Sequence, residues 1–119
     1  MIKPRIAKRE VTLHILRAFG LHISKRLGQN FLVDEAAVDA IVAAAGVKAG
    51  DAVLEIGPGI GTLTQGLLEA GAKVVAVELD QRLVGVLRET LAGYDDVRVI
   101  HGDILKVDIP REMATAPYK

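Results

Sequence analysis

The sequence predicts an α/β fold in which helices precede an incomplete parallel sheet of three strands. Short apolar runs at 52–56, 73–78 and 97–100, each bounded by turn-forming residues, have the profile of buried strands. Helical periodicity fills the segments between them, at 61–70 and 80–93. Because strand–helix–strand units connect parallel strands by right-handed crossovers, the three strands should lie side by side in one sheet.

Two further helices are expected ahead of the sheet. The first, over residues 5–19, would stop at Gly20, and the second would begin after Asp34 as its N-cap and stop at Gly46. Their apolar faces would consist of Val11, Ile15, Ala18 and Phe19 in the first helix and of Val38, Ile41, Val42 and Ala45 in the second. Residues 21–32 have no helical period and should form an extended connection.

Glycines and an aspartate mark the ends of the two helices between the strands. Gly71 would stop the first of them. Asp80 would cap the second, and Gly93 would stop it.

Length and composition restrict the class of protein. The 119 residues suffice for one small domain, and with 50% hydrophobic and 25% charged residues they resemble an ordinary soluble globular protein. The absence of cysteine excludes disulfides, thiolate metal sites and cysteine nucleophiles. No apolar run approaches the ~18 residues of a membrane span, and residues 1–9 lack the apolar core of a signal peptide. We therefore expect a cytoplasmic protein without a membrane partner.

The formal net charge of +0 hides an uneven distribution. Residues 1–28 carry seven basic side chains and one acidic one, whereas residues 29–119 carry eight basic and fourteen acidic ones. We divide the chain into a basic helical N-terminal extension, residues 1–24, and a body, residues 25–119. A basic extension on an acidic body suggests a polyanionic partner such as nucleic acid. A solvated helix explains the same charges, and the excess is too small to decide between the two.

A glycine-rich loop, Gly57-Pro58-Gly59-Ile60-Gly61, lies between the first strand and the helix that follows it. Glycines permit a sharp turn and let a ligand approach the backbone, and the helix presents free N–H groups beside that ligand. Glu78 ends the second strand, 21 positions after the first glycine, where a carboxylate can accept both hydroxyls of a ribose. These features predict a nucleotide-type cofactor.

The details favour S-adenosylmethionine over a dinucleotide. A dinucleotide motif has Gly or Ala at its sixth position, which is Thr62 here. Glu55 would lie near a pyrophosphate, where its charge is unfavourable, whereas the cationic sulfonium of S-adenosylmethionine tolerates a carboxylate. Asp103 follows the third strand and could accept a hydrogen bond from an adenine amino group. A turn-forming Asp103 and a plain loop acid at Glu55 are the alternatives.

Four ordered motifs carry a resemblance to a known family. They are Gly-Gln-Asn-Phe-Leu at 28–32, Glu-Ile-Gly-Pro-Gly-Ile-Gly at 55–61, Val-Ala-Val-Glu-Leu-Asp at 75–80 and His-Gly-Asp-Ile-Leu at 101–105. From about Lys25 to about Asp108 the chain resembles the ribosomal RNA adenine N6,N6-dimethyltransferases. The resemblance implies a Rossmann-like class I S-adenosylmethionine-dependent methyltransferase fold and dimethylation of adenine N6 in small-subunit (16S) ribosomal RNA. Gly28 and Pro58 look more like the small-subunit enzymes than the macrolide-resistance enzymes of the large subunit, which remain an alternative.

By that resemblance, eleven residues would bind the cofactor: Gln29, Asn30, Leu32, Glu55, Gly57, Gly59, Gly61, Glu78, Leu79, Asp103 and Ile104. Gln29, Asn30 and Leu32 would close over its methionine end, unless they belong to a simple capped loop. Glu78 would hold the ribose, and Asp103 with Ile104 would hold the adenine. We assign no metal ligands.

The catalytic residues implied by the resemblance do not occur in this sequence. The family's Asn-Leu-Pro-Tyr-type motif, which orients the flipped adenine, is absent, and Pro117-Tyr118 lacks the preceding Asn. We therefore expect a cofactor-binding fragment that is inactive alone, with ribosomal RNA as the partner of the complete enzyme. A non-catalytic module that binds S-adenosylmethionine or RNA is the second hypothesis, and a nicotinamide dehydrogenase fragment is the third. The first strand would form an edge of the sheet, through which the isolated chain should self-associate.

Overall fold

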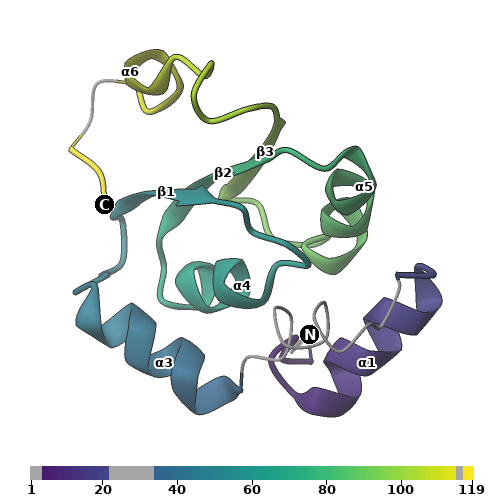
Figure 1. Ribbon diagram of the computed structural model, residues 1–119. Coiled ribbons are helices and arrows are strands. Elements are labelled where there is room, and N and C mark those ends of the chain that lie inside the picture. Colours follow the sequence, from purple (N-terminus) through teal and green to yellow (C-terminus); the bar gives the residue numbers. More distant parts are fainter. Residues whose placement is uncertain (1–3, 22–33, 115–116) are drawn as a thin grey trace.

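The computed structural model describes residues 4–21, 34–114 and 117–119. In chain order, and as labelled in Figure 1, the elements are α1 (Arg9–Ala18), α3 (Glu35–Ala44), β1 (Ala52–Ile56), α4 (Thr62–Glu69), β2 (Lys73–Glu78), α5 (Gln81–Thr90), β3 (Val97–His101) and α6 (Ile109–Glu112).

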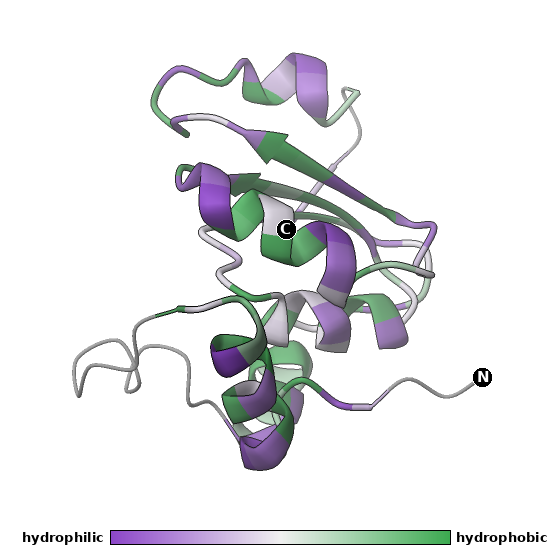
Figure 2. Ribbon diagram, turned by 90° about the vertical axis from the view of Figure 1, so that its right-hand side faces the viewer, coloured by the Kyte–Doolittle hydropathy of each residue, from purple (hydrophilic) through white to green (hydrophobic). Residues whose placement is uncertain are grey.

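The strands form one parallel sheet in the order β1-β2-β3, as the sequence predicts. Leu54 pairs with Val75, and Val77 pairs with Ile100. Helices α4 and α5 pack on one face of the sheet, and α6 lies on the opposite side (Figure 1). Figure 2 shows that the strands between these layers are largely hydrophobic. The predicted α/β class with an incomplete parallel sheet is confirmed.

The predicted aspartate N-caps are confirmed, and each predicted glycine stop lies two or three residues past the end of its helix. Asp34 accepts a hydrogen bond from the amide of Ala37 at 2.7 Å, and Asp80 accepts one from the amide of Arg82 at 2.9 Å. The glycines that follow α1, α3, α4 and α5 all have left-handed backbone angles: Gly20, Gly46, Gly71 and Gly93. Among the described residues, no helix is long and apolar enough to cross a membrane.

The predicted apolar face of the first helix is partly wrong. α1 starts four residues later than predicted and buries Thr12, Ile15 and Leu16, whereas Ala18 and Phe19 are exposed. The buried hydroxyl of Thr12 donates to a backbone carbonyl of the preceding segment at 2.6 Å. A hydrophobic period does not count a threonine, so it misplaces a face that a threonine helps to form.

The predicted apolar face of the second helix is also partly wrong, for a different reason. Val38 of α3 is fully buried, but Ile41 is 46% exposed and Ala45 is exposed. α3 packs on α4 through a narrow contact, in which Val38 lies against Gly66. A narrow contact buries fewer positions than a full amphipathic face, so Ile41 is left at the surface.

Two hydrophobic clusters form the core. One lies between the sheet and α4 and consists of Val53, Leu67, Ala72, Val74 and Ala76. The other joins the N-terminal segment, the glycine loop and α5, and consists of Ile6, Ile15, Leu16, Ile60, Val86, Leu87 and Leu91. The second cluster makes the segment around α1 part of the folded body.

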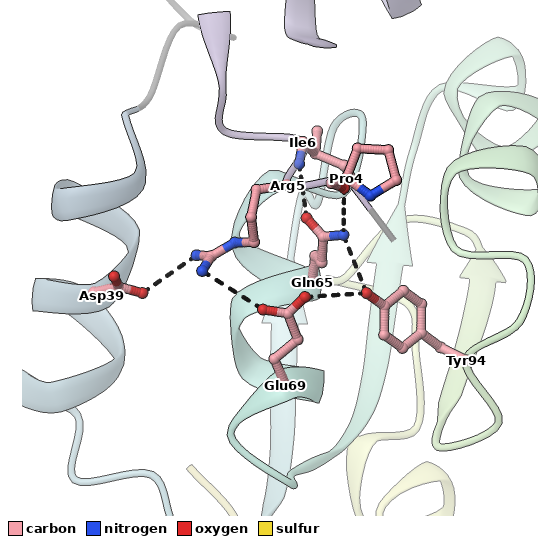
Figure 3. A network of polar contacts seen from close by, with 7 residues as sticks. All are labelled: Pro4, Arg5, Ile6, Asp39, Gln65, Glu69 and Tyr94. Carbon is pink, nitrogen blue, oxygen red and sulfur yellow. Dashed lines mark hydrogen bonds and ion pairs between the residues drawn. The ribbon is translucent and has the colours of Figure 1, made fainter. Parts of the chain in front are cut away.

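A polar network fastens the start of the chain to α4 (Figure 3). Gln65, which is 1% exposed, accepts from the amide of Ile6 at 2.7 Å and donates to the carbonyl of Pro4 at 2.9 Å. Its amide also donates to the hydroxyl of Tyr94 at 3.0 Å. Arg5 forms ion pairs across this network, to Asp39 of α3 at 3.2 Å and to Glu69 of α4 at 3.5 Å. Arg5, one of the basic residues of the predicted extension, therefore forms ion pairs within the fold. The domain boundary expected after residue 24 lies outside the described residues.

The last residues of the chain lie along part of the β1 edge. Tyr118 forms a parallel bridge with Ala52, and the amide of Leu54 donates to the carbonyl of Lys119 at 2.7 Å. The ammonium of Lys119 contacts Asp51 at 2.8 Å and, as its hydrogen-bond and charge partner, lowers the pKa of that carboxyl. β1 is an edge strand, as expected, and residues 118–119 pair with its first half.

Candidate cofactor-binding site

A cavity of about 440 Å³ opens where β1 and β2 end and the glycine loop begins. Its volume lies within the range of roughly 300–1,000 Å³ that is common for small-molecule sites. Four of the predicted site residues line it: Glu55, Gly57, Gly59 and Glu78. The sequence therefore identified the acidic and glycine part of this cavity.

The glycine loop continues the sheet and then turns back on itself. The amide of Gly57 donates to the carbonyl of Val77 at 2.9 Å, and Gly57 itself has φ of 69°. This left-handed angle is costly for residues with a Cβ, so the turn between strand and loop requires glycine.

Gly61 has a different role from the other loop glycines. It is the N-cap of α4, with φ of 95°, and it is not among the residues that line the cavity. A Cβ there would lie 3.1 Å from Leu91 Cδ2 and 3.2 Å from Thr90 Oγ1, both near the end of α5. Thr90 also donates its hydroxyl to the carbonyl of Ile60 at 2.8 Å. Gly61 thus permits the close contact by which α5 holds the loop in place.

Glu78 is oriented by backbone donors at the carboxyl end of β2. One carboxylate oxygen accepts from the amide of Gly59 at 3.1 Å, and the other accepts from the amide of Asp80 at 2.9 Å. The residue is only 6% exposed. Because both oxygens are held by fixed donors, the carboxylate keeps one orientation at the mouth of the cavity.

Glu55 is buried in β1 and accepts a hydrogen bond from the hydroxyl of Thr64 in α4. Burial raises the pKa of Glu55 from 4.5 to about 7; the Thr64 hydroxyl opposes this rise, and the nearby charge of Glu78 adds to it. Near neutral pH the group therefore exchanges between its neutral and its charged form.

The other predicted residues lie apart from the cavity or outside the described residues. Asp103 accepts a hydrogen bond from the amide of Leu105 at 2.9 Å, in the turn after β3. Leu79 is 69% exposed, and its carbonyl lies 3.1 Å from the ring nitrogen of His101, which connects the ends of β2 and β3. Ile104 is half-buried. The residues that were expected to close over the methionine end lie outside the described residues: Gln29, Asn30 and Leu32.

The sequence does not indicate which apolar residues line the cavity, nor that a hydroxyl donates a hydrogen bond to Glu55. Ile41 of α3, Leu63 of α4 and Leu83 of α5 line the cavity, whereas the sequence predicts only that each lies on the apolar face of its helix. Thr64 follows Glu55 by nine positions, and no short motif relates them. An apolar stripe along a helix gives no information on the polar side chains between its members. Pairing with Glu55 becomes visible only when α4 packs on the sheet.

The charges of the cavity suit a cation and not a pyrophosphate. Among the described residues, Glu55 and Glu78 are the only charged ones that line it, and no lysine, arginine or histidine does. A pyrophosphate would be repelled by two carboxylates, whereas a sulfonium or ammonium group would be attracted. The two held oxygens of Glu78 also suit the paired hydroxyls of a ribose. The described residues thus fit S-adenosylmethionine, and they contain no group of side chains suited to hold a metal ion.

Comparison with known sequences agrees with a methyltransferase. A family model described as ribosomal RNA adenine dimethylase matches residues 20–118. A ribosomal RNA small subunit methyltransferase A from Leuconostoc citreum is 50% identical over 110 residues, which are 92% of this chain and 37% of that protein. The chain therefore spans little more than a third of the length of this relative.

Comparison with solved structures confirms the Rossmann-like methyltransferase fold. A dimethyladenosine transferase from Plasmodium falciparum is 36% identical with a TM-score of 0.55, over 62% of this chain and 28% of that one. The 23S rRNA methyltransferase ErmE is 35% identical with a TM-score of 0.58, over 62% of this chain and 30% of that one. A coclaurine N-methyltransferase solved with N-methylheliamine and SAH (S-adenosylhomocysteine) is 25% identical with a TM-score of 0.56, over 61% of this chain and 23% of that one.

Proposed function

Because this chain belongs to the ribosomal RNA adenine dimethylase family, we propose that it forms the S-adenosylmethionine-binding part of an enzyme that dimethylates adenine N6 in small-subunit ribosomal RNA. The observation that carries the proposal is the cavity at the glycine loop, where the only charged lining residues in the described part of the chain are two carboxylates. The name of the Leuconostoc relative supports the small subunit as the target. The complete enzyme would then work in the cytoplasm, on the ribosome.

Each part of the cavity has a separate task in this proposal. Glu78 accepts the two ribose hydroxyls with oxygens that the amides of Gly59 and Asp80 already orient. The backbone of Gly57 and Gly59 lies along the methionine part, and Glu55 faces the positive sulfonium. When bound, S-adenosylmethionine supplies an electrophilic methyl group. The protein positions that group and excludes water from it.

The remaining predicted contacts belong to the same proposal. Leu79 and Ile104 are apolar residues at the ends of β2 and β3 that would lie against the adenine ring. Asp103 would turn a carboxylate oxygen to the adenine amino group, while its present partner is the amide of Leu105. Gln29, Asn30 and Leu32 would cover the methionine end.

The proposed RNA contact involves the outer side of α1. Lys8, Arg9 and Arg17 are exposed there, whereas Arg5 is engaged in ion pairs with Asp39 and Glu69. Exposed basic side chains bind phosphates without reading sequence, so this surface would add affinity and not specificity.

Calorimetry with three ligands tests the cofactor assignment. S-adenosylmethionine and S-adenosylhomocysteine should bind, and NAD should give no heat. Glu78→Gln should weaken both adenosyl ligands by about tenfold or more, because a hydrogen bond to a charged acceptor is lost. Glu10→Gln is the matched control, since it removes the same charge from an exposed position of α1 and should leave binding unchanged. NAD binding, or equal binding by both variants, would contradict the proposal.

The similarity to ErmE favours one alternative, a methyltransferase of large-subunit RNA. The same cavity would serve that enzyme, so calorimetry does not separate the two. The complete protein, incubated with radiolabelled S-adenosylmethionine and each purified subunit RNA, separates them by which RNA acquires the label. The proposal predicts label in the small-subunit RNA.

A further inference from the structure

Two carboxylates of the cavity point to the same face of the sheet. Glu55 in β1 pairs with Ala76 in β2, and Glu78 lies two residues beyond Ala76, so alternation places both side chains on one side. The neighbouring helices bring no described charge to this cavity: α3 contributes Ile41 and α5 contributes Leu83. Glu78 is therefore the one described charged group that faces Glu55.

The two carboxylates are held in unequal ways. Glu78 accepts from two backbone amides, which stabilise its negative charge. Glu55 is 9% exposed and accepts from one described donor, the hydroxyl of Thr64. With a second carboxylate nearby and little solvent, the charge on Glu55 depends on what else occupies the cavity. The pKa of Glu55, which burial raises to about 7, is consistent with this geometry.

We propose that Glu55 is the residue by which this cavity distinguishes the positively charged methyl donor from its neutral-sulfur product. The proposal rests on the proposed function, because it presumes that the cavity binds S-adenosylmethionine. Donor and product share the ribose, the adenine and the amino-acid end, and they differ in the methyl group and the charge on sulfur. A sulfonium beside Glu55 favours the carboxylate and expels its proton, whereas a thioether does not.

Methyl transfer reverses this attraction. The S–CH3 bond breaks with its electron pair left on sulfur, a bond forms between the methyl carbon and the acceptor nitrogen, and that nitrogen loses a proton to solvent water. The sulfur becomes neutral, so two carboxylates remain in the cavity without a described counter-charge. Glu55 then takes up a proton, and the product loses the interaction that favoured the donor. The residue would thereby promote exchange of product for fresh donor.

The proposal predicts opposite pH behaviour for the two ligands. Affinity for S-adenosylmethionine should rise by roughly tenfold from pH 6 to pH 8, as Glu55 no longer has to release a proton. Affinity for S-adenosylhomocysteine should change little over the same range. In Glu55→Gln the difference between the two pH profiles should vanish. Any pH dependence that remains in this variant belongs to the ligands' own amino groups.

Carbon-13 NMR of the glutamate side chains tests the proposal directly in the 119-residue chain. The carboxyl resonance of Glu55, assigned by its loss in Glu55→Gln, should titrate near pH 7 in the free protein. Saturation with S-adenosylmethionine should lower that midpoint by at least one pH unit, and saturation with S-adenosylhomocysteine should not. In Thr64→Val the free midpoint should rise further, because the stabilising hydroxyl is gone.

The possible results separate this proposal from the proposed function. Equal midpoints with both ligands, or a free midpoint near 4.5, would overturn the role of Glu55 while leaving cofactor binding intact. If neither ligand perturbs any resonance of the cavity, the proposed function fails and this proposal fails with it. A donor-to-product preference that is unchanged in Glu55→Gln would also contradict the proposal, whatever the titration shows.

Discussion

A carboxyl group buried in β1 makes the stability of this fold depend on pH. Folding raises the pKa of Glu55 from 4.5 to about 7, chiefly by burial. Between these values the folded chain binds more protons than the unfolded chain, so the free energy of unfolding falls as the pH rises through this window. The residue thus destabilises the empty protein at the pH where its charge is useful for binding a cation.

Glu55→Gln should remove this dependence. The amide keeps an acceptor for the Thr64 hydroxyl and cannot ionise. Relative to the wild type, the variant should gain up to about 3 kcal/mol between pH 4.5 and pH 8, the free energy that corresponds to the change in pKa. Urea unfolding of both proteins at pH 5 and pH 8 measures it. A stability difference that is the same at both pH values would show that Glu55 titrates normally.

Gln65 is a second residue with a specific structural role, because its buried side-chain amide binds the backbone of the N-terminal segment. Gln65→Leu should cost about 2 kcal/mol or more, because the amide of Ile6 and the carbonyl of Pro4 lose their partner. Tyr94→Phe is the control: it removes a single hydroxyl from the same network and should cost about 1 kcal/mol. Urea midpoints of both variants give the comparison, and an equal loss would mean that Gln65 does not hold the N-terminal segment.

Neither Thr64 nor Gln65 could be assigned from the sequence. Both are polar residues within a helix whose apolar stripe predicts only which side is buried. Their partners lie nine positions upstream for Thr64 and near the chain start for Gln65. Contacts at such separations follow from how α4 packs, and periodicity carries no information about them. Glu78 and the loop glycines were predictable because each lies at the end of a strand or in the loop that follows one.

At the scale of elements, the crossing of α3 and α4 depends on one missing side chain. A Cβ at Gly66 would come within 2.4 Å of Val38 Cγ1, and a β-branched valine has little freedom to move away. Gly66→Ala should therefore destabilise by about 1–3 kcal/mol, despite the better helix propensity of alanine.

A second helical glycine provides the matched control. Gly85 lies in α5, and a Cβ added there would meet nothing within 4 Å, so Gly85→Ala should stabilise by up to about 1 kcal/mol. Thermal unfolding of both variants gives the sign of each effect. If both substitutions stabilise, the close α3–α4 contact does not exist in solution.

The elements of the sheet were predictable, and the faces of the first helices were not. β1 and β2 have the predicted bounds, and β3 is one residue longer than predicted. Their apolar runs and the glycine stops are local signals, which survive folding unchanged. The faces of α1 and α3 depend on a buried threonine and on the narrow contact at Gly66. Which face of a helix is buried depends on the surface that it packs against, so it cannot be predicted from the helix sequence alone.

At the scale of the whole molecule, the N-terminal segment packs against the glycine loop. Ile6, Ile15 and Leu16 pack in one cluster with Ile60 of the glycine loop. Most of that segment precedes residues 20–118, which the family model matches. The loop is therefore supported by a part of the chain that the family pattern does not include.

The edge of β1 predicts self-association of the chain. Residues 118–119 pair with the first half of the strand, near Ala52 and Leu54, while Ile56 at its end is 61% exposed. An apolar strand edge offers free backbone groups to a second copy. Sedimentation should show a dimer or larger species whose share grows with protein concentration, and Ile56→Lys should reduce it. A monomer at all concentrations would contradict the expectation.

Amide NMR tests most directly whether the cavity at the glycine loop binds S-adenosylmethionine. Adding the ligand to nitrogen-15-labelled protein should shift the resonances of Gly57, Gly59 and Asp80, whose amides line the cavity or hold Glu78. Those of Asp95 and Asp96, at the opposite end of the strands, should stay in place. Shifts at the opposite end, or none at the glycine loop at saturating ligand, would contradict the account.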